Sequence, residues 1–596
     1  MATLPAGMMR PAFDWRCFAA TPAAVLLVWA AWALLRIALL PVTGWDPSDP
    51  DDYMRLLEVR DWLGGQPWFD VAQYRMAPPH GASMHWSRLV DLPIAALILA
   101  FRTVMPQAQA ELWAMVWVPL LYLLLALFAL RAIALKLGLS GLALAFTLVL
   151  LPLFPLLPGN FGPLRIDHHT AQSVAAVVCG ALLLNARSRW VAAACGLVGA
   201  AWIAISLEAL PLLAVLGGLY GLRYWLRGDR SLAWYLGALA LAAPLLSLAT
   251  RPLAAFAESY CDILRPGHMA AFAAAGLIAL LLPFAPGQGS AKGRFLSLAL
   301  IPLVCGPLAL VSLGTCAADP FGALDPLLKT YWHGFILEGV PIWRQPPSVA
   351  VMLLWTVLLV PAGWWLARHQ GLATGKREES WTVLALYALA AGAYSLLVMR
   401  EALAAQLLAI PFAALLLADL LPRARAIKST LPRIAATLGA LALATPTFGS
   451  AALKPLDDMA GHDARRSAAL ANISGAACDY ASLNTLPPAH LFAPLDRGPE
   501  ILAKTPHSVV MAGYHRNQAK MVDVVRAFTG DPRAAEAIVR RNGADYVLAC
   551  SSGKDIAVFR TARADNLANL LVQGRAPAWL EPVPGFDGSL RVYRVK

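Results

Sequence analysis

The stretch GPLRIDHHTAQS (residues 162–173) sets an arginine, an aspartate and two adjacent histidines between two long apolar runs. Each run is close to the length that one helix needs to cross a membrane, which is about 17 to 25 residues. Ionisable side chains at membrane depth are costly and usually mark a functional site. The stretch therefore predicts membrane helices with a polar site at their ends.

The composition favours a polytopic α-helical membrane protein. The 596 residues are 59% hydrophobic and 14% charged, and the mean hydropathy is +0.59, which lies outside the usual range of soluble domains. The net charge of +12 does not indicate a nucleic-acid partner, because basic residues collect in the short cytoplasmic loops of membrane proteins.

About thirteen apolar segments can be threaded through the membrane so that the basic loops share one side. Arg10 and Arg16 precede the first segment, which predicts a cytoplasmic N-terminus. We interpret the stretch 92–101 as interfacial or re-entrant, because a full crossing there would move every later basic cluster outside. The segments lie at about 18–41, 112–130, 140–158, 171–186, 190–206, 209–222, 231–249, 269–284, 295–314, 348–367, 381–398, 402–421 and 433–447. We expect a multi-pass protein of the inner (cytoplasmic) membrane, in contact with membrane lipids.

An odd number of crossings predicts two domains, a transmembrane catalytic domain (1–447) and a periplasmic or extracytoplasmic α/β domain (448–596). The second region lacks a spanning run. It alternates the strand-like pieces HSVVMAG (507–513), ADYVLAC (544–550) and SLRVYRV (589–595) with the helix-like run DPRAAEAIVRRNG (531–543). Its length of about 150 residues is typical of one domain.

The acidic and histidine-containing loops all fall on the outer side of this topology. The first outer loop (43–90) contains DPSDPDDY, the second contains RIDHHTAQ, and a late outer loop (315–347) contains Glu338. Asp167 and His169 are two positions apart and can point to one side of an extended backbone. A carboxylate with an imidazole is a plausible pair of ligands for Mn²⁺ or Mg²⁺. The missing carboxylates would come from Asp49, Asp51 or Asp52 and from Glu338.

Each of these signals also has a purely structural interpretation. The DPDD run (49–52) is often a solvated turn, and Asp167 could simply cap the helix that follows it. Glu338 alone is a weak signal. Their joint placement on one side of the membrane favours the metal site over these alternatives.

Several basic side chains are candidates for binding a phosphate. Arg400 interrupts an apolar stretch where one segment leaves the outer face and the next re-enters, and arginine binds phosphate in bidentate geometry. The alternative is a buried pair with Glu401. The further candidates in the first outer loop are Arg75, His80, His85 and Arg88. Glu208 lies near the same boundary without an assigned role.

These motifs, in this order, resemble the GT-C glycosyltransferases, and within them the catalytic subunit of oligosaccharyltransferase and its bacterial and archaeal single-chain counterparts. DDYMRLLEVRD (51–61) resembles the first-loop motif that holds the catalytic and metal-binding aspartate, which implies this role for Asp51. RIDHHTAQ is similar to the archaeal second motif, which implies metal contacts by Asp167 and His169, beside His168 as a further candidate. FILEGV (335–340) implies a place near metal and acceptor for Glu338, and the resemblance implies a phosphate contact for Arg400.

One departure from that family concerns the acceptor. Members that glycosylate asparagine carry WWDYG in the C-terminal domain, whereas Trp579 is the single tryptophan after residue 448 here. The loop that holds Tyr514, His515 and Arg516 could shape acceptor choice or could pack the domain against the membrane part. Recognition of an asparagine sequon is therefore not expected.

The sequence thus favours a metal-assisted glycosyltransferase that uses a polyprenyl-phosphate- or polyprenyl-pyrophosphate-linked glycan as donor. Its acceptor would be a glycan, a lipid or a protein on the outer face, and a single-sugar transferase is one form of this hypothesis. A flippase or transporter for lipid-linked glycans is the alternative, although polar residues sit at helix ends rather than at mid-membrane. A structural assembly protein would not need Asp51 or Asp167.

Two cysteine pairs are candidates for disulfides. Cys261 and Cys316 fall in predicted outer loops, and Cys478 and Cys550 fall in the C-terminal domain. Either pair could be oxidised in an extracytoplasmic compartment.

Overall fold

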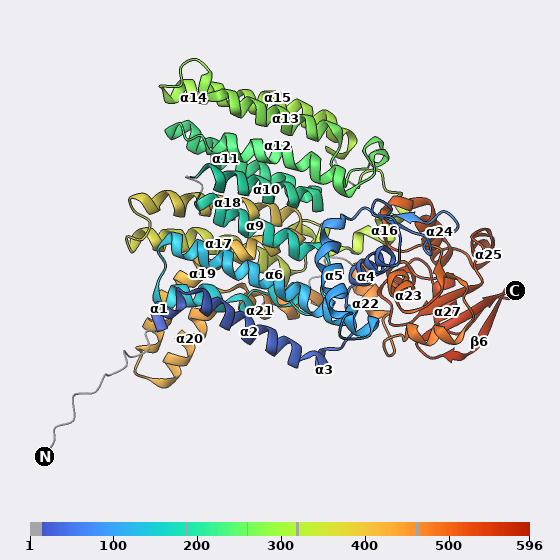
Figure 1. Ribbon diagram of the computed structural model, residues 1–596. Coiled ribbons are helices and arrows are strands. Elements are labelled where there is room, and N and C mark those ends of the chain that lie inside the picture. The colour runs from blue at the N-terminus through green and yellow to red at the C-terminus, as the bar shows by residue number, and fades with distance from the viewer. Residues whose placement is uncertain (1–14, 186–187, 259, 318–320, 460–463) are drawn as a thin grey trace.

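The computed structural model describes residues 15–185, 188–258, 260–317, 321–459 and 464–596. Figure 1 shows most of the chain as helices that run side by side, with a sheet domain against one end of them. The apolar composition explains this architecture, because a helix satisfies its backbone hydrogen bonds internally when no water is available. The chain is a multi-pass membrane protein.

The described residues include eight helical segments that are long and apolar enough to cross a membrane, or nine if a pair bent by 91° counts as one span. The eight are α6 (Gln107–Leu137), η2 with α11 (Leu207–Arg227), α12 (Ser231–Thr250), α13 with η4 (Pro266–Phe284), α14 with α15 (Ala291–Leu313), α17 (Pro347–His369), α18 (Lys376–Leu397) and η9 with α19 (Met399–Arg425). The bent pair is α20 (Thr430–Ala444) with α21 (Pro446–Met459).

Further apolar helices are shorter. They are α2 (Pro22–Ala38), α9 (His168–Leu184) and α10 (Arg189–Ile205). Besides α4 and α5, described below, the other short α-helices among the described residues of this part are α1 (Trp15–Ala19), α3 (Leu40–Thr43), α7 (Gly141–Val149), α8 (Leu157–Asn160) and α16 (Pro326–Tyr331). The number of about thirteen crossings stays a prediction, because length and composition identify eight or nine.

The apolar stretch 92–101 lies in α5 (Arg88–Phe101), whose 14 residues are too few to cross the hydrocarbon core. Figure 1 shows α5 beside α4 (Pro50–Leu63), at the end of the helices that faces the sheet domain. It is not one of the candidate spans. Because α5 does not cross the membrane, the predicted side of each later loop is unchanged.

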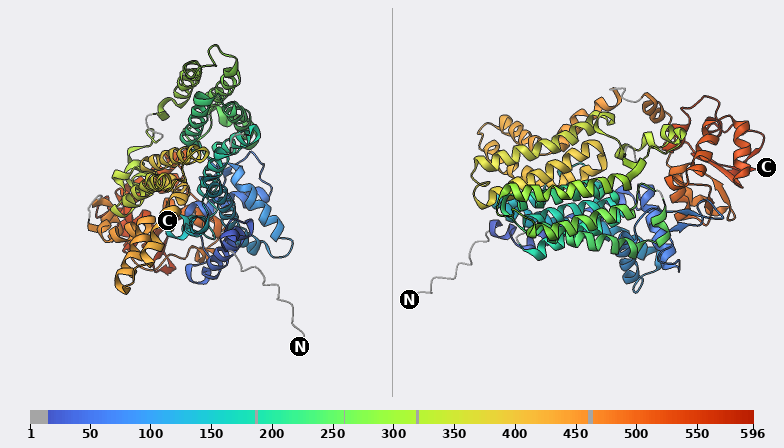
Figure 2. Two further views of the ribbon diagram at one scale, coloured as in Figure 1. Left: turned by 90° about the vertical axis from the view of Figure 1, so that its left-hand side faces the viewer. Right: turned by 90° about the horizontal axis from the view of Figure 1, so that it is seen from above.

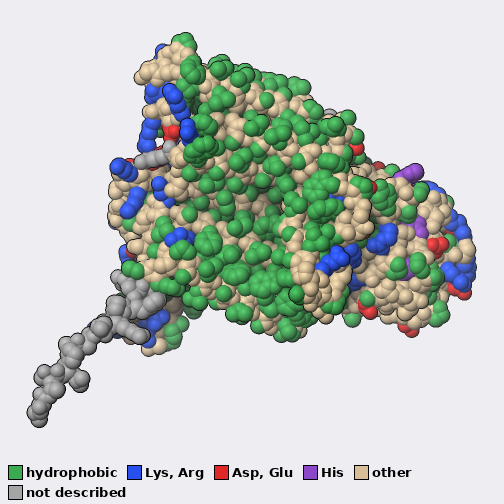
Figure 3. All heavy atoms as spheres, viewed as in Figure 1, with side chains coloured by type: hydrophobic (Ala, Val, Ile, Leu, Met, Phe, Trp, Pro, Cys, Tyr) green, Lys and Arg blue, Asp and Glu red, His purple; other side chains and the backbone are tan. Residues whose placement is uncertain are grey.

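Basic side chains gather at the end of the helices that is far from the sheet domain. Figure 3 shows lysine and arginine side chains there, with a largely apolar surface between them and further basic side chains beside and on the sheet domain. At the basic end, Arg294 donates hydrogen bonds to the carbonyl groups of Trp225 and Leu226 at the end of α11. The basic loops thus lie together, as the charge pattern predicts.

Small residues let the membrane helices approach closely. A Cβ atom on Gly276 of α13 would lie 2.9 Å from the Cβ of Ala240 in α12, and one on Gly196 of α10 would collide with the Tyr235 carbonyl oxygen. In lipid, such close packing replaces the hydrophobic force that joins helices in water. Figure 2 shows α13, α14 and α15 as the outermost layer on one side of the bundle.

The C-terminal domain is built on a five-stranded sheet in the order β4-β3-β5-β7-β6. Strand β3 pairs in parallel with β4 and β5, and β7 pairs antiparallel with β5 and β6. The strands are β3 (His490–Phe492), β4 (Ser508–Val509), β5 (Tyr546–Cys550), β6 (Leu580–Asp587) and β7 (Leu590–Val595). The helices are α22 (Ala464–Ala471), α23 (Gly498–Lys504), α24 (Gln518–Thr529), α25 (Pro532–Arg541), α26 (Lys554–Phe559) and α27 (Leu567–Val572).

The predicted elements of this domain are confirmed at β4, β5, β7 and α25, whereas β3 and β6 are additional. Strand β3 is only three residues long, and β6 contains Pro582 and Pro584, which weaken the sequence pattern of a strand. The predicted boundary at residues 447 and 448 falls inside α21 and stays a prediction.

The first outer loop folds onto the C-terminal domain. Its helix α4 and its short hairpin of β1 (Ala72–Gln73) and β2 (Ala82–Ser83) share one apolar core with the sheet domain, to which Met54, Met76 and Trp86 contribute. The Ala77 N–H donates to the Val509 carbonyl, and the Val509 N–H donates to the Arg75 carbonyl. The loop and the domain therefore form one folded unit.

Both candidate cysteine pairs are disulfides. Cys261 is bonded to Cys316, which joins the segment before α13 to the start of the late outer loop, and Cys478 is bonded to Cys550 at the end of β5. Both bridges lie on the side of the sheet domain, away from the basic loops. This placement agrees with an oxidising compartment on that side.

Candidate active site

The second outer motif forms the N-terminus of α9. Asp167 is the N-cap, and its Oδ1 accepts a hydrogen bond of 2.6 Å from the His168 N–H. The side chain of Asp167 is 1% exposed. Its capping interaction is thus present, but it uses one carboxylate oxygen and leaves the other, Oδ2, without a hydrogen bond from the described residues.

The first outer motif forms the N-terminus of α4, where Asp49 is the N-cap and Asp51 and Asp52 lie in the first turn. The Oδ1 atom of Asp52 accepts hydrogen bonds of 2.8 Å and 3.0 Å from the N–H groups of Ile166 and Asp167. These two bonds fix the first acidic motif directly against the second. The bonded residues are 114 and 115 positions apart in the sequence, so the fold brings two distant motifs into direct contact.

Arg165 holds three of these carboxylates together. Its Nη1 lies 2.7 Å from Asp49 Oδ2 and 3.1 Å from Asp52 Oδ2, and its Nη2 lies 3.7 Å from Asp167 Oδ2. The guanidinium therefore offsets part of the repulsion in a crowded acidic group.

The late outer loop adds Glu338, which lies in η7 (Leu337–Gly339). Its Oε1 is 4.0 Å from His169 Nε2 and 3.8 Å from Arg400 Nη1. The same guanidinium of Arg400 lies 3.3 Å from Glu208 Oε1. A Cβ on Gly339 would lie 3.0 Å from Arg400 Nη2, so the guanidinium packs closely against this glycine.

The four residues expected to hold a cation are thus gathered in one place. His169 Nε2 is 3.3 Å from Asp167 Oδ2, and Asp51 interacts electrostatically with both Asp167 and Glu338. We call the set of Asp49, Asp51, Asp52, Asp167, His168, His169 and Glu338 the acidic site. Three segments that are distant in the sequence build it, as the motifs predict, while the metal-binding roles of the individual residues stay predictions.

The electrostatics of the acidic site show an excess of negative charge. Burial, followed by the charges of Asp167 and Asp49, raises the pKa of Asp51 well above its usual value. Burial also raises the pKa of Asp52 to about 7, although Arg165 opposes this shift. Groups in such an environment gain most from a bound cation, which would lower both pKa values.

The residues fit a divalent cation. One ligand atom each of Asp167, His168 and His169 lies within 4.8 Å of the others. Asp167 Oδ2 is buried and accepts no hydrogen bond from the described residues, so a coordinating ion would satisfy it. Carboxylate and imidazole ligands suit Mn²⁺ or Mg²⁺ as well as Zn²⁺, and the choice among them is not fixed by this geometry.

Two of the predicted phosphate-binding arginines have other partners. Arg88 is completely buried and donates to the carbonyl groups of Glu58, Trp68 and Asp70 and to the Asp91 carboxylate. The sequence motif could not reveal this, because backbone acceptors leave no residue pattern. Its role in binding a donor phosphate is therefore corrected to a structural one.

Arg75, the second of these arginines, also has partners within the chain instead of a free guanidinium for phosphate. Its guanidinium donates to the carbonyl groups of Leu502, Thr505 and His507 in the C-terminal domain. These bonds occupy both terminal nitrogens and join the first outer loop to α23 and β4. Arg400 alone of the three predicted arginines borders the acidic site. His80 is exposed on the first outer loop.

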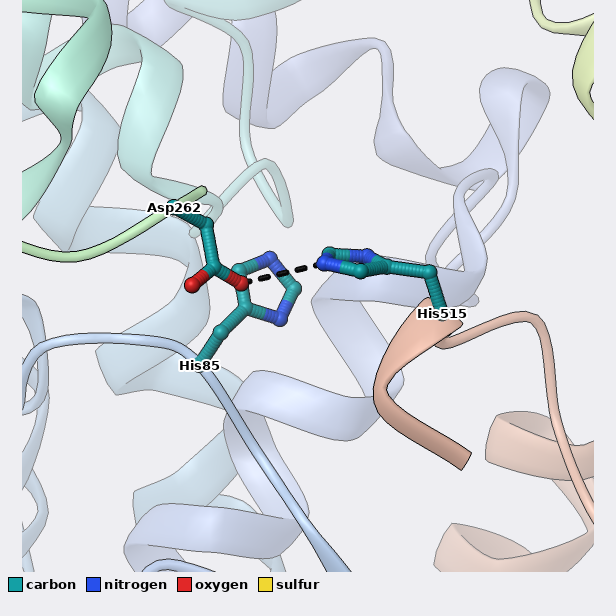
Figure 4. A group of neighbouring side chains, drawn as sticks. All are labelled: His85, Asp262 and His515. Atoms are coloured by element: carbon teal, nitrogen blue, oxygen red, sulfur yellow. Dashed lines mark hydrogen bonds and ion pairs between the residues drawn. The ribbon is translucent and has the colours of Figure 1, made fainter. Parts of the chain in front are cut away.

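A second polar cluster lies beside the acidic site, and Figure 4 shows its three members, His85, Asp262 and His515, pointing toward one another from three segments. His515 Nε2 lies 3.1 Å from Asp262 Oδ2, and Arg516 pairs with the same carboxylate at 2.9 Å. Burial alone would raise the pKa of Asp262. His515 and Arg516 stabilise its anion more strongly, so the pKa lies well below its usual value.

This second cluster is a poor cation site despite its histidines. Asp262 already has a guanidinium partner, and Arg251 donates to the His85 carbonyl at 3.1 Å. Two arginines beside one carboxylate repel a divalent ion. The cluster instead joins the segment before α13 to the first outer loop and the C-terminal domain.

Four further contacts in the site could not be expected from the motifs. The Tyr514 hydroxyl donates to Asp51 Oδ1 at 3.1 Å, and the Trp86 ring lies 5.5 Å from the Tyr514 ring and 6.1 Å from the His168 ring. Glu208 is the ion-pair partner of Arg400. Tyr514 lies in a loop 463 positions from Asp51, and only the fold brings the two side chains together.

No protein-family model matches the chain, and no curated protein matches it. Among solved structures it is similar to the archaeal oligosaccharyltransferase AglB from Archaeoglobus fulgidus in complex with an inhibitory peptide and a dolichol-phosphate. The identity is 15%, the TM-score is 0.62, and the match covers 96% of this chain and 74% of that chain.

Two further structures of the Archaeoglobus fulgidus oligosaccharyltransferase are similar to the chain. The apo form has 16% identity and a TM-score of 0.63 over 92% of this chain and 72% of that chain. The complex with Zn and sulfate has 16% identity and a TM-score of 0.55 over 95% and 73%. Identities this low establish the fold alone. The chain therefore has the GT-C fold, and the expected fold class is confirmed.

Proposed function

We propose that the protein is a glycosyltransferase that transfers a sugar or oligosaccharide from a polyprenyl-phosphate- or polyprenyl-pyrophosphate-linked donor to an acceptor on the outer face of the inner membrane. The shared fold supports this, since the similar archaeal enzyme is an oligosaccharyltransferase bound to a dolichol-phosphate and an inhibitory peptide. The basic loops at the opposite end of the helices support a periplasmic or extracytoplasmic C-terminal domain.

The observation that carries the proposal is the acidic site, where Asp51, Asp167 and Glu338 from three outer segments meet Arg400 at the ends of the membrane helices. A lipid-linked donor keeps its tail in the bilayer and its charged head at the interface. A site for transfer from such a donor must therefore lie where membrane helices end, and the acidic site does.

An apolar groove supports a donor with a lipid tail. It has a volume of about 540 Å³ and lies between α11, α12, α13 and α15, with a lining that is almost entirely apolar. It begins at Leu210, two residues after Glu208, and extends along α11 to Gly221. A hydrocarbon chain in this groove would have its phosphate end beside Arg400.

The acidic site would hold a divalent cation, Mn²⁺ or Mg²⁺, through Asp51, Asp167, His169 and Glu338, with Asp49, Asp52 and His168 next to them. When bound, the cation supplies Lewis-acid stabilisation of the phosphate that leaves the sugar. The other tasks fall to the side chains. Arg400 would pair with the donor phosphate in place of Glu338, and His85, 5.7 Å from the Trp86 ring, is a further candidate for that phosphate.

In the reaction, a lone pair of the acceptor atom attacks the anomeric carbon and forms the new glycosidic bond. The bond from that carbon to the phosphate oxygen breaks, and its electron pair stays on the phosphate. Asp51 is placed to orient the acceptor and to take its proton. Tyr514 holds Asp51 in this orientation through the hydrogen bond to Oδ1.

A transfer assay in membranes tests the proposal. Extracts of lipid-linked sugars are incubated with the intact protein, with and without EDTA, and with Asp51→Ala and Asp167→Ala. We expect transfer to be lost on chelation, restored by Mn²⁺ or Mg²⁺, and reduced about 100-fold or more in each variant. The control is Asp565→Ala, which removes an exposed carboxylate that pairs with Arg563.

Two results would contradict the proposal. Full transfer by Asp51→Ala or Asp167→Ala would remove that residue from the catalytic list. Movement of intact lipid-linked glycan across vesicles, with the same dependence on these residues but without transfer, would favour the flippase alternative.

A further inference from the structure

A small cavity lies between the late outer loop and the C-terminal domain. Its volume is about 120 Å³, and the late outer loop lines it with Tyr331, Trp332 and Phe335, while the C-terminal domain lines it with Asp496 and Lys554, among others. Pockets for drug-sized ligands measure about 300 to 1,000 Å³. This one therefore has room for a single ring or side chain of a larger molecule.

One carboxylate in the cavity is available to a ligand. Asp555 uses both oxygens, because Oδ2 accepts from the Asp496 N–H at 3.0 Å and Oδ1 accepts from the Ile556 N–H at 2.8 Å. Within the described part of the chain, no such donor reaches the carboxylate of Asp496, which is only partly buried. Asp496 can accordingly accept hydrogen bonds from a molecule in the cavity.

The charges of the lining favour a neutral occupant. Two acidic side chains, Asp496 and Asp555, face two basic ones, Arg466 and Lys554. Burial, followed by the nearby Asp555 charge, raises the pKa of Asp496 to about 7, so near neutral pH this carboxyl group can both accept hydrogen bonds and donate them. Lys554 would repel an ammonium group, and the carboxylates would repel an anion. Neutral hydroxyl groups can form hydrogen bonds with both the acidic and the basic side chains.

The cavity is connected to the acidic site through two consecutive residues. A Cβ on Gly513 would lie 3.1 Å from Trp332 Nε1 and 3.5 Å from Asp496 Oδ1, so both side chains rest on this glycine. The next residue, Tyr514, donates to Asp51. Asp496 also interacts electrostatically with Asp49 of the acidic site. A molecule in the cavity is therefore close to the reacting centre.

We propose that this cavity is the acceptor subsite and that it binds one sugar residue of a glycan acceptor, with Trp332 against the ring and Asp496 accepting from its hydroxyl groups. The inference rests on the proposed function and names its acceptor class. Aromatic rings with a few placed polar groups form typical small-ligand sites. The lining combines aromatic side chains, the available carboxyl group of Asp496 and charges of both signs. A sugar ring, which combines apolar faces with neutral hydroxyls, matches these three features.

A peptide acceptor fits the site less well. The tryptophan of the C-terminal domain, Trp579, donates to the Pro532 carbonyl at the far side of α25 and does not line the cavity. The aromatic lining comes instead from the late outer loop. A site built in this way has no counterpart of the WWDYG sequence that serves asparagine sequons.

Saturation-transfer NMR on the full chain in lipid nanodiscs tests the inference without donor or added metal. The probes are glucose, galactose, mannose and arabinose, with two short peptides that contain an asparagine sequon or a serine. We expect a signal for at least one monosaccharide and a decrease of about ten-fold in Asp496→Asn and in Trp332→Ala, because the ligand hydroxyls lose their carboxyl partner in the first variant and the sugar ring loses its aromatic partner in the second. The matched controls are Asp565→Asn and Trp343→Ala, which change an exposed carboxylate and an exposed indole of the late outer loop.

The outcomes separate this inference from the proposed function. Asp51→Ala is expected to bind the monosaccharide like the intact protein, even though its transfer activity is lost. Signals that are absent, or equal in all variants, would overturn the acceptor subsite while leaving the transfer assay as the test of the function. A peptide signal that depends on Asp496 and Trp332, without a monosaccharide signal, would also overturn it and assign a peptide acceptor.

Discussion

Two groups of charges, one fully buried and one partly exposed, lie at the same end of the membrane helices, and they are built in opposite ways. Arg55, Glu58, Arg88 and Asp91 connect α4 to α5 with side chains that are at most 1% exposed. This balanced network has two positive and two negative charges, which pair at distances of 2.9 Å to 3.3 Å. The acidic site gathers five carboxylates and is bordered by two guanidinium groups, those of Arg165 and Arg400.

The difference separates a structural role from a binding role. Burying charges costs free energy unless partners compensate for it. In the balanced network each charged side chain has an ion-pair partner from within the chain, although Arg55 Nε and Nη2 and Glu58 Oε1 have no hydrogen bond among the described residues. The acidic site compensates its charges only in part, through Arg165 and Arg400, and under the proposed function a bound cation compensates the remaining negative charge. The excess of one sign, rather than burial itself, distinguishes a ligand site from a structural ion-pair network.

The largest effect is expected in the balanced network. Asp91→Ala leaves two buried arginines with one remaining carboxylate, and we expect the free energy of unfolding to fall by roughly 3 to 5 kcal/mol. Denaturant titration in detergent measures this change, and Asp565→Ala, at an exposed pair, is expected to cost no more than about 1 kcal/mol. Unchanged stability in Asp91→Ala would contradict a structural role.

The acidic site should respond in the opposite manner. Asp51→Asn keeps the shape of the side chain but removes one of several like charges, so we expect an unchanged or higher melting temperature. Transfer should fall by about 100- to 1,000-fold, because a residue at the reacting centre is lost. Parallel melting curves and transfer rates check both parts, and a loss of stability that explains the loss of transfer would contradict the comparison.

A smaller effect concerns pH. The pKa values of Asp51 and Asp52 are raised, the second to about 7, so these groups bind protons that a cation must displace. The affinity for Mn²⁺ should therefore rise with pH, by up to about ten-fold per unit for each proton released, between roughly pH 6 and pH 8. Titration calorimetry at three pH values measures this slope, which should become shallower in Asp52→Asn.

The candidate residues of the acidic site stand out in the sequence because they combine unusual residue types with a fixed order of outer loops, and the structure brings them near one another while their roles stay predictions. Asp167, His169 and Glu338 are such residues, and a charge pattern places their loops on one side. Arg75 and Arg88 carry the same kind of signal, yet carbonyl groups occupy their donors. Backbone acceptors are invisible in a sequence, so an arginine that binds phosphate looks the same as one that binds the main chain.

Partners of the site that come from the C-terminal domain or from ordinary loops could not be predicted. Tyr514 reaches Asp51 across 463 positions, and Asp262 reaches His515 across 253. Neither residue stands in a distinctive motif, and no periodicity relates such distant positions. The short strand β3 escaped prediction for a different reason, since three residues are too few to show alternation.

The apolar core shared by the first outer loop and the sheet domain has a consequence for biogenesis. The loop leaves the ribosome early, but Arg75 can bond to the Thr505 carbonyl only after 430 further residues have been synthesised. At a synthesis rate of about 5 to 20 residues per second, this delay is roughly 20 to 90 s. During that interval the apolar surface formed by Met54, Met76 and Trp86 lacks its cover, so the newly made loop is prone to aggregation and needs the protection of a chaperone until the C-terminal domain folds.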